Sequence, residues 1–273
     1  MHPIFFSIWK FTAYSYGLFV GVAFIASNLY LLHSLAKSKN RIISQDELYS
    51  LFLYLIIFGY TGSRLLFVIT KLQEYILHPL CIFKFWTGGF VHYGGLISAT
   101  VCIIIYSKRK KIHLFKLCDF FAPALALGHA IGRIGCFFAG CCYGKKSNLP
   151  WAVTFNNEDS GALQGVCLHP TQFYESLGNL LLFVCLHFYS KKQHKAGTPT
   201  AIYFICYAVL RFIIEFFRGD DRGMQYFGLS ISQVISIFLF ITGVIVLIVS
   251  LKTSKNLSKN IENKKIRTKI SWL

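Results

Sequence analysis

The sequence predicts an all-α integral membrane protein with seven transmembrane helices, the N-terminus outside and the C-terminus in the cytoplasm. Three observations support this prediction. Hydrophobic residues make up 55% of the chain, and the mean hydropathy of +0.53 is higher than soluble domains usually show. Apolar stretches recur along most of the chain at about the 20 residues needed to cross hydrocarbon. Most lysines and arginines lie in short segments between these stretches.

The formal net charge of +17 raises the question of a nucleic-acid partner. A protein that binds nucleic acid through such charge needs a soluble basic face. Here the basic residues lie mainly in the segments between apolar runs, where they determine membrane topology. We therefore expect no nucleic-acid partner.

Seven apolar stretches account for the predicted spans. The third is the shortest, and two glycines lie at its start. The fifth follows a proline, which is favoured at the first turn of a helix. The sixth carries charged residues, and the seventh is almost entirely apolar. The predicted spans are residues 12–33, 48–70, 93–107, 117–139, 171–189, 200–217 and 229–251.

The distribution of charge predicts the orientation. With the N-terminus outside, four segments face the cytoplasm: 34–47, 108–116, 190–199 and the tail from 252. These hold 18 lysines and arginines, against 7 in the outer segments. Positive charge accumulates on the cytoplasmic side of membrane proteins. We therefore predict a seven-span membrane domain at 1–251 and a basic cytoplasmic tail at 252–273.

The sixth span contains a stripe of polar residues. Tyr207, Arg211 and Glu215 are spaced four apart, and Arg218 follows three residues later. On a helix this spacing places them on one face. One interpretation is a self-neutralising ion pair that merely makes insertion tolerable. The other is a functional polar site, because charged groups within hydrocarbon are costly.

Arg64 and Arg133 also lie inside predicted spans, and glycines at positions 59, 62, 128, 132 and 135 lie near them. The glycines allow a helix or a ligand to approach closely. An unbalanced group of arginines suggests an anion, and the guanidinium fork suits phosphate. In a membrane, the obvious phosphate belongs to a phospholipid headgroup.

Two further stretches lie near the outer leaflet. His92 and Tyr93 precede two glycines, which suggests either an anion site at a helix start or an ordinary interfacial aromatic pair. His169, Tyr174 and Glu175 occur in "HPTQFYES" at the start of the fifth span. These residues fit a catalytic site, and they equally fit a structural role in which hydrogen bonds tie the spans together.

The motifs together resemble the bacterial prolipoprotein diacylglyceryl transferase family. The matching stretches occur in family order over residues 12–250. They are "YGL" at 16–18, "GSR" at 62–64, "YGGLI" at 93–97, "GRIG" at 132–135 followed by "YGKKSNLPWAV", then "HPTQFYES" and "YAVLRFIIEFFRGDD".

The resemblance implies a multi-pass enzyme of the bacterial cytoplasmic (inner) membrane. It would transfer the diacylglyceryl group of phosphatidylglycerol to the lipobox cysteine thiol of a lipoprotein precursor, without a metal or other cofactor. Arg133 resembles the arginine that binds phosphatidylglycerol, and Arg211 would contact the headgroup or the gate. We predict catalytic residues Tyr16, His92, Tyr93, Arg211 and Glu215, and substrate-binding residues Arg64, Arg133, His169, Tyr174, Glu175, Tyr207 and Arg218.

The sequence departs from the family pattern at the expected base. The usual histidine before the double glycine is replaced by Tyr93, with His92 one residue earlier. One position on a helix rotates a side chain by about 100°, so His92 substitutes only if this segment is not yet helical. His129, one turn before Arg133, is the alternative base.

The stretch "GRIGCFFAGCCYG" also differs, because Cys136, Ala139 and Cys141 replace polar family residues, and Cys142 follows. We favour an altered lipid site in which the cysteines pack. The alternatives are a metal site completed by His129, although the spacing lacks a C-x-x-C pair, or a disulfide.

Two alternative functions also fit these residues. One is a related lipid transferase with a different acceptor, and the other is a non-catalytic phospholipid-binding or transport protein.

Overall fold

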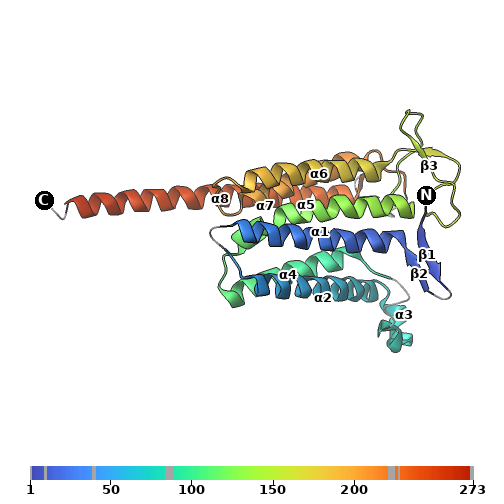
Figure 1. The fold of residues 1–273 in the computed structure, drawn as a ribbon, viewed down its shortest axis with the longest axis horizontal. Coiled ribbons are helices and arrows are strands. Elements are labelled where there is room, and N and C mark those ends of the chain that lie inside the picture. The colour runs from blue at the N-terminus through green and yellow to red at the C-terminus, as the bar shows by residue number, and fades with distance from the viewer. Residues whose placement is uncertain are drawn as a thin grey trace. The chain divides into compact units, whose positions relative to one another are not determined.

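The computed structural model describes residues 2–8, 11–38, 41–83, 89–220, 225–226 and 228–270, with side chains described at 2–7, 12–38, 41–82, 89–220 and 228–252. Long helices dominate these residues, and a short helix and a 3-10 turn follow the second of them (Figure 1). The helices are α1 (Ser15–Lys37), α2 (Gln45–Thr70), α3 (Leu72–Leu77), η1 (Pro79–Phe83), α4 (His92–Lys110), α5 (Leu114–Ala139), α6 (Thr171–Ser190), α7 (Thr198–Glu215) and α8 (Ile231–Ile270).

Each predicted span coincides with one long helix, and the ends differ by a few residues. Five of these helices are long and apolar enough to cross a membrane: α1, α2, α5, α7 and the first 22 residues of α8. Helix α4 ends in three basic residues, and α6 carries buried polar side chains, which lowers its hydropathy. The chain is a helical multi-pass membrane protein. Helix α8 also continues into the predicted tail.

Three two-stranded antiparallel ribbons were not predicted. They are β1 (Ile4–Ile8) with β2 (Phe11–Tyr14), β3 (Val153–Thr154) with β4 (Cys167–Leu168), and β5 (Gln225–Tyr226) with β6 (Leu229–Ser230). The first ribbon moves the start of the first span, because residues 12–14 pair with β1 and the helix begins at Ser15. Such ribbons satisfy backbone groups between helices.

The chain divides into two compact units, residues 1–31 with 118–273 and residues 32–117. In the first unit, α7 packs against α6 and α8. Its core includes a small-residue face of α5, formed by Ala122 and Ala126, against Leu186 of α6 and Tyr203 of α7. Alanines at these positions let the larger side chains of the neighbouring helices pack closely.

Polar contacts fix the helix ends of this unit. Buried Asp119 accepts hydrogen bonds from the backbone N–H groups of Gly197 and Thr200, at 2.6 and 3.0 Å. It thereby satisfies N–H groups at the start of α7, which have no partner within the helix. The Ser27 hydroxyl donates to the Ala124 carbonyl at 3.1 Å and ties α1 to α5.

In the second unit, α2 and α4 pack at glycines. A side chain at Gly62 would meet the Gly94 carbonyl oxygen at 2.7 Å, and one at Gly94 would meet the Gly62 carbonyl. This close approach is the small-residue packing typical of membrane helices. Ser44 and Glu47 form a capping box at the start of α2, and Glu47 pairs with Lys110 of α4 at 3.0 Å.

Candidate functional site

The site forms around Glu175, which lies one turn into α6 and is completely buried. The loop after α5 fixes the start of this helix. The Thr171 hydroxyl donates to the Cys142 carbonyl at 2.7 Å, and the Gln172 amide donates to the Cys141 carbonyl at 2.8 Å. These bonds hold the first turn of α6 against the end of α5, so the Glu175 carboxylate has a defined position.

Helix α5 presents two basic side chains to this carboxylate. His129 and Arg133 are four residues apart and therefore share a face. Arg133 Nη2 lies 2.8 Å from Glu175 Oε1, and His129 Nε2 lies 3.9 Å from the same oxygen. The Tyr207 ring of α7 packs against the His129 ring at a centroid distance of 5.0 Å. The sequence-predicted residues Arg133, Glu175 and Tyr207 are thus brought together.

Helix α7 and the residues after it complete the site. Arg211 Nη2 pairs with Glu215 Oε2 at 2.7 Å, and its Nη1 lies 4.0 Å from Glu175 Oε2. Arg218 Nη1 lies 4.0 Å from the same Glu175 oxygen. Arg218 also makes two hydrogen bonds to the Asp220 carboxylate, at 2.7 and 2.8 Å. Arg211 of the predicted polar stripe therefore lies near Glu175 of α6, and Arg218, which was expected on the same helix, lies just beyond the end of α7.

We call these seven residues the Glu175 cluster: His129, Arg133, Glu175, Arg211, Glu215, Arg218 and Asp220. Its three arginines face three carboxylates, so their formal charges balance among the described residues. The expectation of unbalanced arginines was wrong for this group. Carboxylates from three parts of the chain offset the cost of burying the guanidinium groups.

One donor in the cluster is available for a ligand. Buried Arg211 Nη1 makes no hydrogen bond within the described part of the chain. Its nearest carboxylate oxygen is 4.0 Å away. An unsatisfied buried N–H group is costly, and an anion that entered the cluster could accept a hydrogen bond from it.

His169 and Tyr174 lie beside the cluster at a junction of three segments. The Gly144 N–H donates to the His169 carbonyl, the Lys145 N–H to the Phe217 carbonyl, and the Gly219 N–H to the Tyr143 carbonyl. A side chain at Gly144 would collide with His169 and Phe217. The junction thus joins the loop after α5 to the start of α6 and the end of α7.

The two predicted residues also contact each other. His169 Nδ1 lies 3.2 Å from the Tyr174 hydroxyl, which accepts a hydrogen bond from the Trp151 indole N–H at 2.8 Å. This aromatic arrangement fits the role of tying segments together as well as it fits a role in binding. Their part in substrate binding stays a prediction.

Arg218 and Cys142 lie outside the helices and influence each other electrostatically. Burial acts to lower the pKa of the Arg218 guanidinium, but hydrogen bonding to Asp220 and the nearby Cys142 outweigh it and raise that pKa. Hydrogen bonds from the Cys136 and Cys141 thiols lower the pKa of Cys142, and Arg218 and Arg133 add to this effect.

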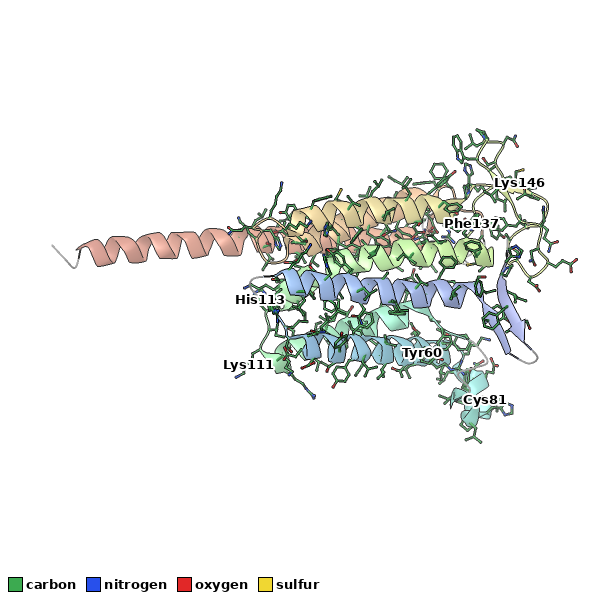
Figure 2. All side chains as sticks on the ribbon, viewed as in Figure 1. Tyr60, Cys81, Lys111, His113, Phe137 and Lys146 are labelled. Carbon is green, nitrogen blue, oxygen red and sulfur yellow. The ribbon has the colours of Figure 1, made fainter. Side chains whose placement is uncertain are left out.

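Arg64 belongs to the other unit and has different partners. It is 2% exposed and donates to the backbone carbonyls of Cys81, Ile82 and Gly89 at 2.9, 3.3 and 3.2 Å. Its guanidinium also lies 5.6 Å from the centre of the Phe67 ring. Figure 2 marks Cys81 in the segment that follows α2. Arg64 holds this segment against α2, and its role in substrate binding stays a prediction.

His92 and Tyr93 lie in the same unit as Arg64, at the first two positions of α4. The condition under which His92 replaces the expected histidine was a segment that is not yet helical, and α4 begins at His92 itself. The two side chains therefore project about 100° apart. Tyr16, the second residue of α1, is 48% exposed, and its backbone lies close to Gly135 of α5. The catalytic roles of all three stay predictions.

Asp220 was missed by the sequence reasoning. It pairs with Arg218 from two residues away, outside any helix, where no periodic spacing indicates a contact. The only available signal was the "RGDD" stretch, in which an arginine and acidic residues are close neighbours.

The fold and the cluster define a multi-pass helical membrane protein with a buried, charge-balanced polar site. The family model of prolipoprotein diacylglyceryl transferase matches residues 3–249. The chain is 38% identical to the phosphatidylglycerol–prolipoprotein diacylglyceryl transferase of Clostridium tetani, over 90% of this chain and 96% of that protein. It is 35% identical to the enzyme of that name from Finegoldia magna, over 96% of this chain and 100% of that protein. This chain belongs to the prolipoprotein diacylglyceryl transferase family.

Proposed function

We propose that this protein transfers the diacylglyceryl group of phosphatidylglycerol to the lipobox cysteine thiol of lipoprotein precursors. The observation that carries the proposal is the Glu175 cluster, which concentrates three guanidinium groups in the interior of a protein of this family. Buried guanidinium groups bind phosphate through charge-assisted hydrogen bonds. A phospholipid is the phosphate source that such a membrane site would meet.

The proposed topology has seven spans, with the N-terminus outside and the C-terminus in the cytoplasm of a bacterial inner membrane. The balance of lysines and arginines between the loops supports this orientation. The loop at 140–170, which borders the cluster, would then lie on the outer side, where a secreted precursor presents its cysteine. Residues 1–251 would form the transferase domain and 252–273 the basic cytoplasmic tail.

In the reaction, the sulfur of the precursor cysteine attacks the carbon of the diacylated glycerol that is bonded to the phosphate oxygen. A carbon–sulfur bond forms, the carbon–oxygen bond to phosphate breaks, and glycerol phosphate leaves with the electron pair. Arg133 and Arg211 would hold the phosphate and stabilise the negative charge that develops on the leaving oxygen. Arg211 Nη1 is the donor that this role needs, because no described residue accepts a hydrogen bond from it.

The thiol must also lose its proton, since a cysteine with a pKa near 8.5 is mostly protonated at neutral pH. His129 is well placed as the acceptor, because its Nε2 lies 3.9 Å from the Glu175 carboxylate, which would stabilise the imidazolium. The second candidate is His92. A comparison of the His129→Asn and His92→Asn variants identifies which histidine is the base. The variant that lacks the base should lose transferase activity at neutral pH and regain part of it at higher pH, where the thiol loses its proton without help.

The test is to incubate the purified protein with phosphatidylglycerol and a lipobox peptide and to detect thioether-linked diacylglycerol by mass spectrometry. We expect the peptide to gain one diacylglyceryl group and glycerol phosphate to appear in equal amount. The same peptide with serine in place of its cysteine is the control and should remain unmodified.

Other outcomes identify the alternative functions. Consumption of phosphatidylglycerol without modification of the peptide would point to a lipid transferase with another acceptor. Binding of the lipid by folded protein without consumption would point to a lipid-binding or transport protein. Either result would overturn the proposal.

A further inference from the structure

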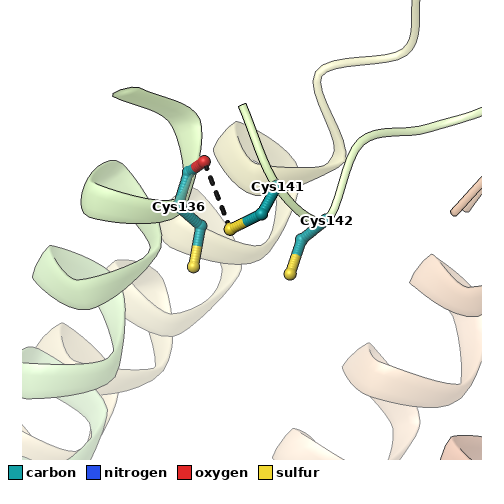
Figure 3. A group of neighbouring side chains, drawn as sticks. All are labelled: Cys136, Cys141 and Cys142. Carbon is teal, nitrogen blue, oxygen red and sulfur yellow. Dashed lines mark hydrogen bonds between the residues drawn. The ribbon is translucent and has the colours of Figure 1, made fainter. Parts of the chain in front are cut away.

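Three cysteines converge at the end of α5, and the proposed reaction uses none of them. Cys136 lies in the last turn of the helix, and Cys141 and Cys142 lie in the loop that follows. Gly140 and Cys142 both adopt left-handed backbone conformations, with φ of 69° and 62°. The chain therefore turns back on itself, and Figure 3 shows the three cysteine side chains as neighbours, with that of Cys141 between the other two.

The sulfur atoms are close enough to share one ion, since all three lie within 4.8 Å of one another. Around a zinc ion with zinc–sulfur distances of about 2.3 Å, tetrahedral geometry separates two ligand sulfurs by roughly 3.8 Å. Small side-chain rotations would thus bring the three thiolates onto one ion. Within the described residues, the group of possible ligand atoms consists of these three sulfurs.

The surroundings of the cysteines suit a soft cation. Three thiolate ligands select ions such as Zn²⁺, whereas Mg²⁺ and Ca²⁺ prefer oxygen. Cys136 is buried, and Cys141 and Cys142 are half-buried, so an ion among them would be partly shielded from solvent.

We propose that Cys136, Cys141 and Cys142 form a site for one Zn²⁺ ion, with the fourth coordination position open to water. The site would have a structural role. The carbonyls of Cys141 and Cys142 accept the hydrogen bonds that fix the first turn of α6, so an ion held by these residues would brace α5 against α6. This inference does not depend on the proposed transfer reaction.

Cobalt binding to the full-length, reduced and metal-free protein tests the site. We expect one equivalent of Co²⁺ to bind, with a sulfur-to-metal charge-transfer absorption, and Zn²⁺ to displace it. Changing Cys136, Cys141 and Cys142 together to serine should abolish this absorption. The matched control is Cys185→Ala, which removes an exposed cysteine from α6 and should leave the absorption unchanged. The proposal is overturned if the wild-type protein binds no metal or if the triple variant binds it equally well.

A second measurement uses the unaltered protein, in case the triple variant does not fold. One equivalent of Zn²⁺ should slow alkylation of the three clustered cysteines at least tenfold, as quantified by mass spectrometry of the peptides. The alkylation rate of Cys185 should not change. Equal rates for the cluster with and without Zn²⁺ would show that these cysteines only pack, and would contradict the proposal.

Discussion

The buried arginines in the two units of this protein are satisfied in different ways. Arg64 donates to three backbone carbonyls and lies against aromatic rings. Arg133 and Arg211 face the carboxylates of Glu175 and Glu215. Backbone carbonyls cannot leave without unfolding a segment, whereas carboxylate pairing can be exchanged for pairing with another anion. We therefore infer that Arg64 stabilises the fold and that the Glu175 cluster binds the phosphate of the proposed lipid substrate.

The largest expected effect is on Arg133. Changing it to alanine removes a hydrogen-bond donor to the phosphate of the proposed substrate. This should lower kcat/KM on the order of 10³-fold, as loss of a donor to developing charge does in other enzymes. The protein should still insert, because removing the charge does not make α5 more polar. The mass-spectrometric transfer assay measures the loss, and the yield of membrane-extracted protein checks insertion. Retention of near-normal activity would contradict a role in phosphate binding.

The second largest effect is expected at Arg64, the arginine that is paired with backbone carbonyls. Arg64→Ala leaves three backbone carbonyls without their donor and should lower the free energy of unfolding by about 3 kcal/mol. Thermal unfolding in detergent measures this change, with Arg41→Ala, at an exposed position of the same unit, as the control. If Arg64→Ala instead raised KM for phosphatidylglycerol and left stability unchanged, Arg64 would bind substrate as the sequence suggested.

The sequence indicated part of the Glu175 cluster but none of the contacts of Arg64, and the reason is physical. The alignment of Tyr207, Arg211 and Glu215 follows from helical periodicity, whereas Arg218 lies beyond the end of α7. Glu175 was singled out because a carboxylate within a span needs a partner. Its contact with Arg133 joins different helices, and no spacing along the chain indicates it. The carbonyl partners of Arg64 carry no side-chain signal at all.

The fold could be predicted in the same graded way. Apolar length located the seven long helices to within a few residues at most ends. The ribbon formed by β1 and β2 could not be predicted from the charge pattern, because its strands pair through backbone groups. The extension of α8 to Ile270 was missed because the tail is polar and gives no apolar window.

A smaller effect is expected at the centre of the cluster. Glu175→Gln keeps the shape of the side chain but removes the charge that Arg133, Arg211 and Arg218 face. The arginines would then hold the headgroup at least as tightly but in a less defined position. We expect kcat to fall roughly 30-fold, or about 2 kcal/mol, while KM for phosphatidylglycerol stays level or falls.

The control for that experiment is Glu158→Gln, which changes an exposed carboxylate of the same unit. It should alter neither constant. A rise in KM with unchanged kcat in Glu175→Gln would show that the carboxylate assists binding rather than the orientation of the arginines.

The smallest effect concerns the junction that holds the cluster in place. A methyl group at Gly144 would lie 2.6 Å from the His169 carbonyl oxygen and 2.8 Å from that of Phe217, so the backbone must shift. Gly144→Ala should therefore cost about 1 to 2 kcal/mol of stability, as overpacking does, and should reduce transfer because Arg218 follows Phe217 directly. Gly21→Ala is the matched control, since nothing lies within 4 Å of its added methyl group. If the two variants unfolded at the same temperature and transferred equally well, the junction would not position the cluster, and its arginines would be held by their carboxylates alone.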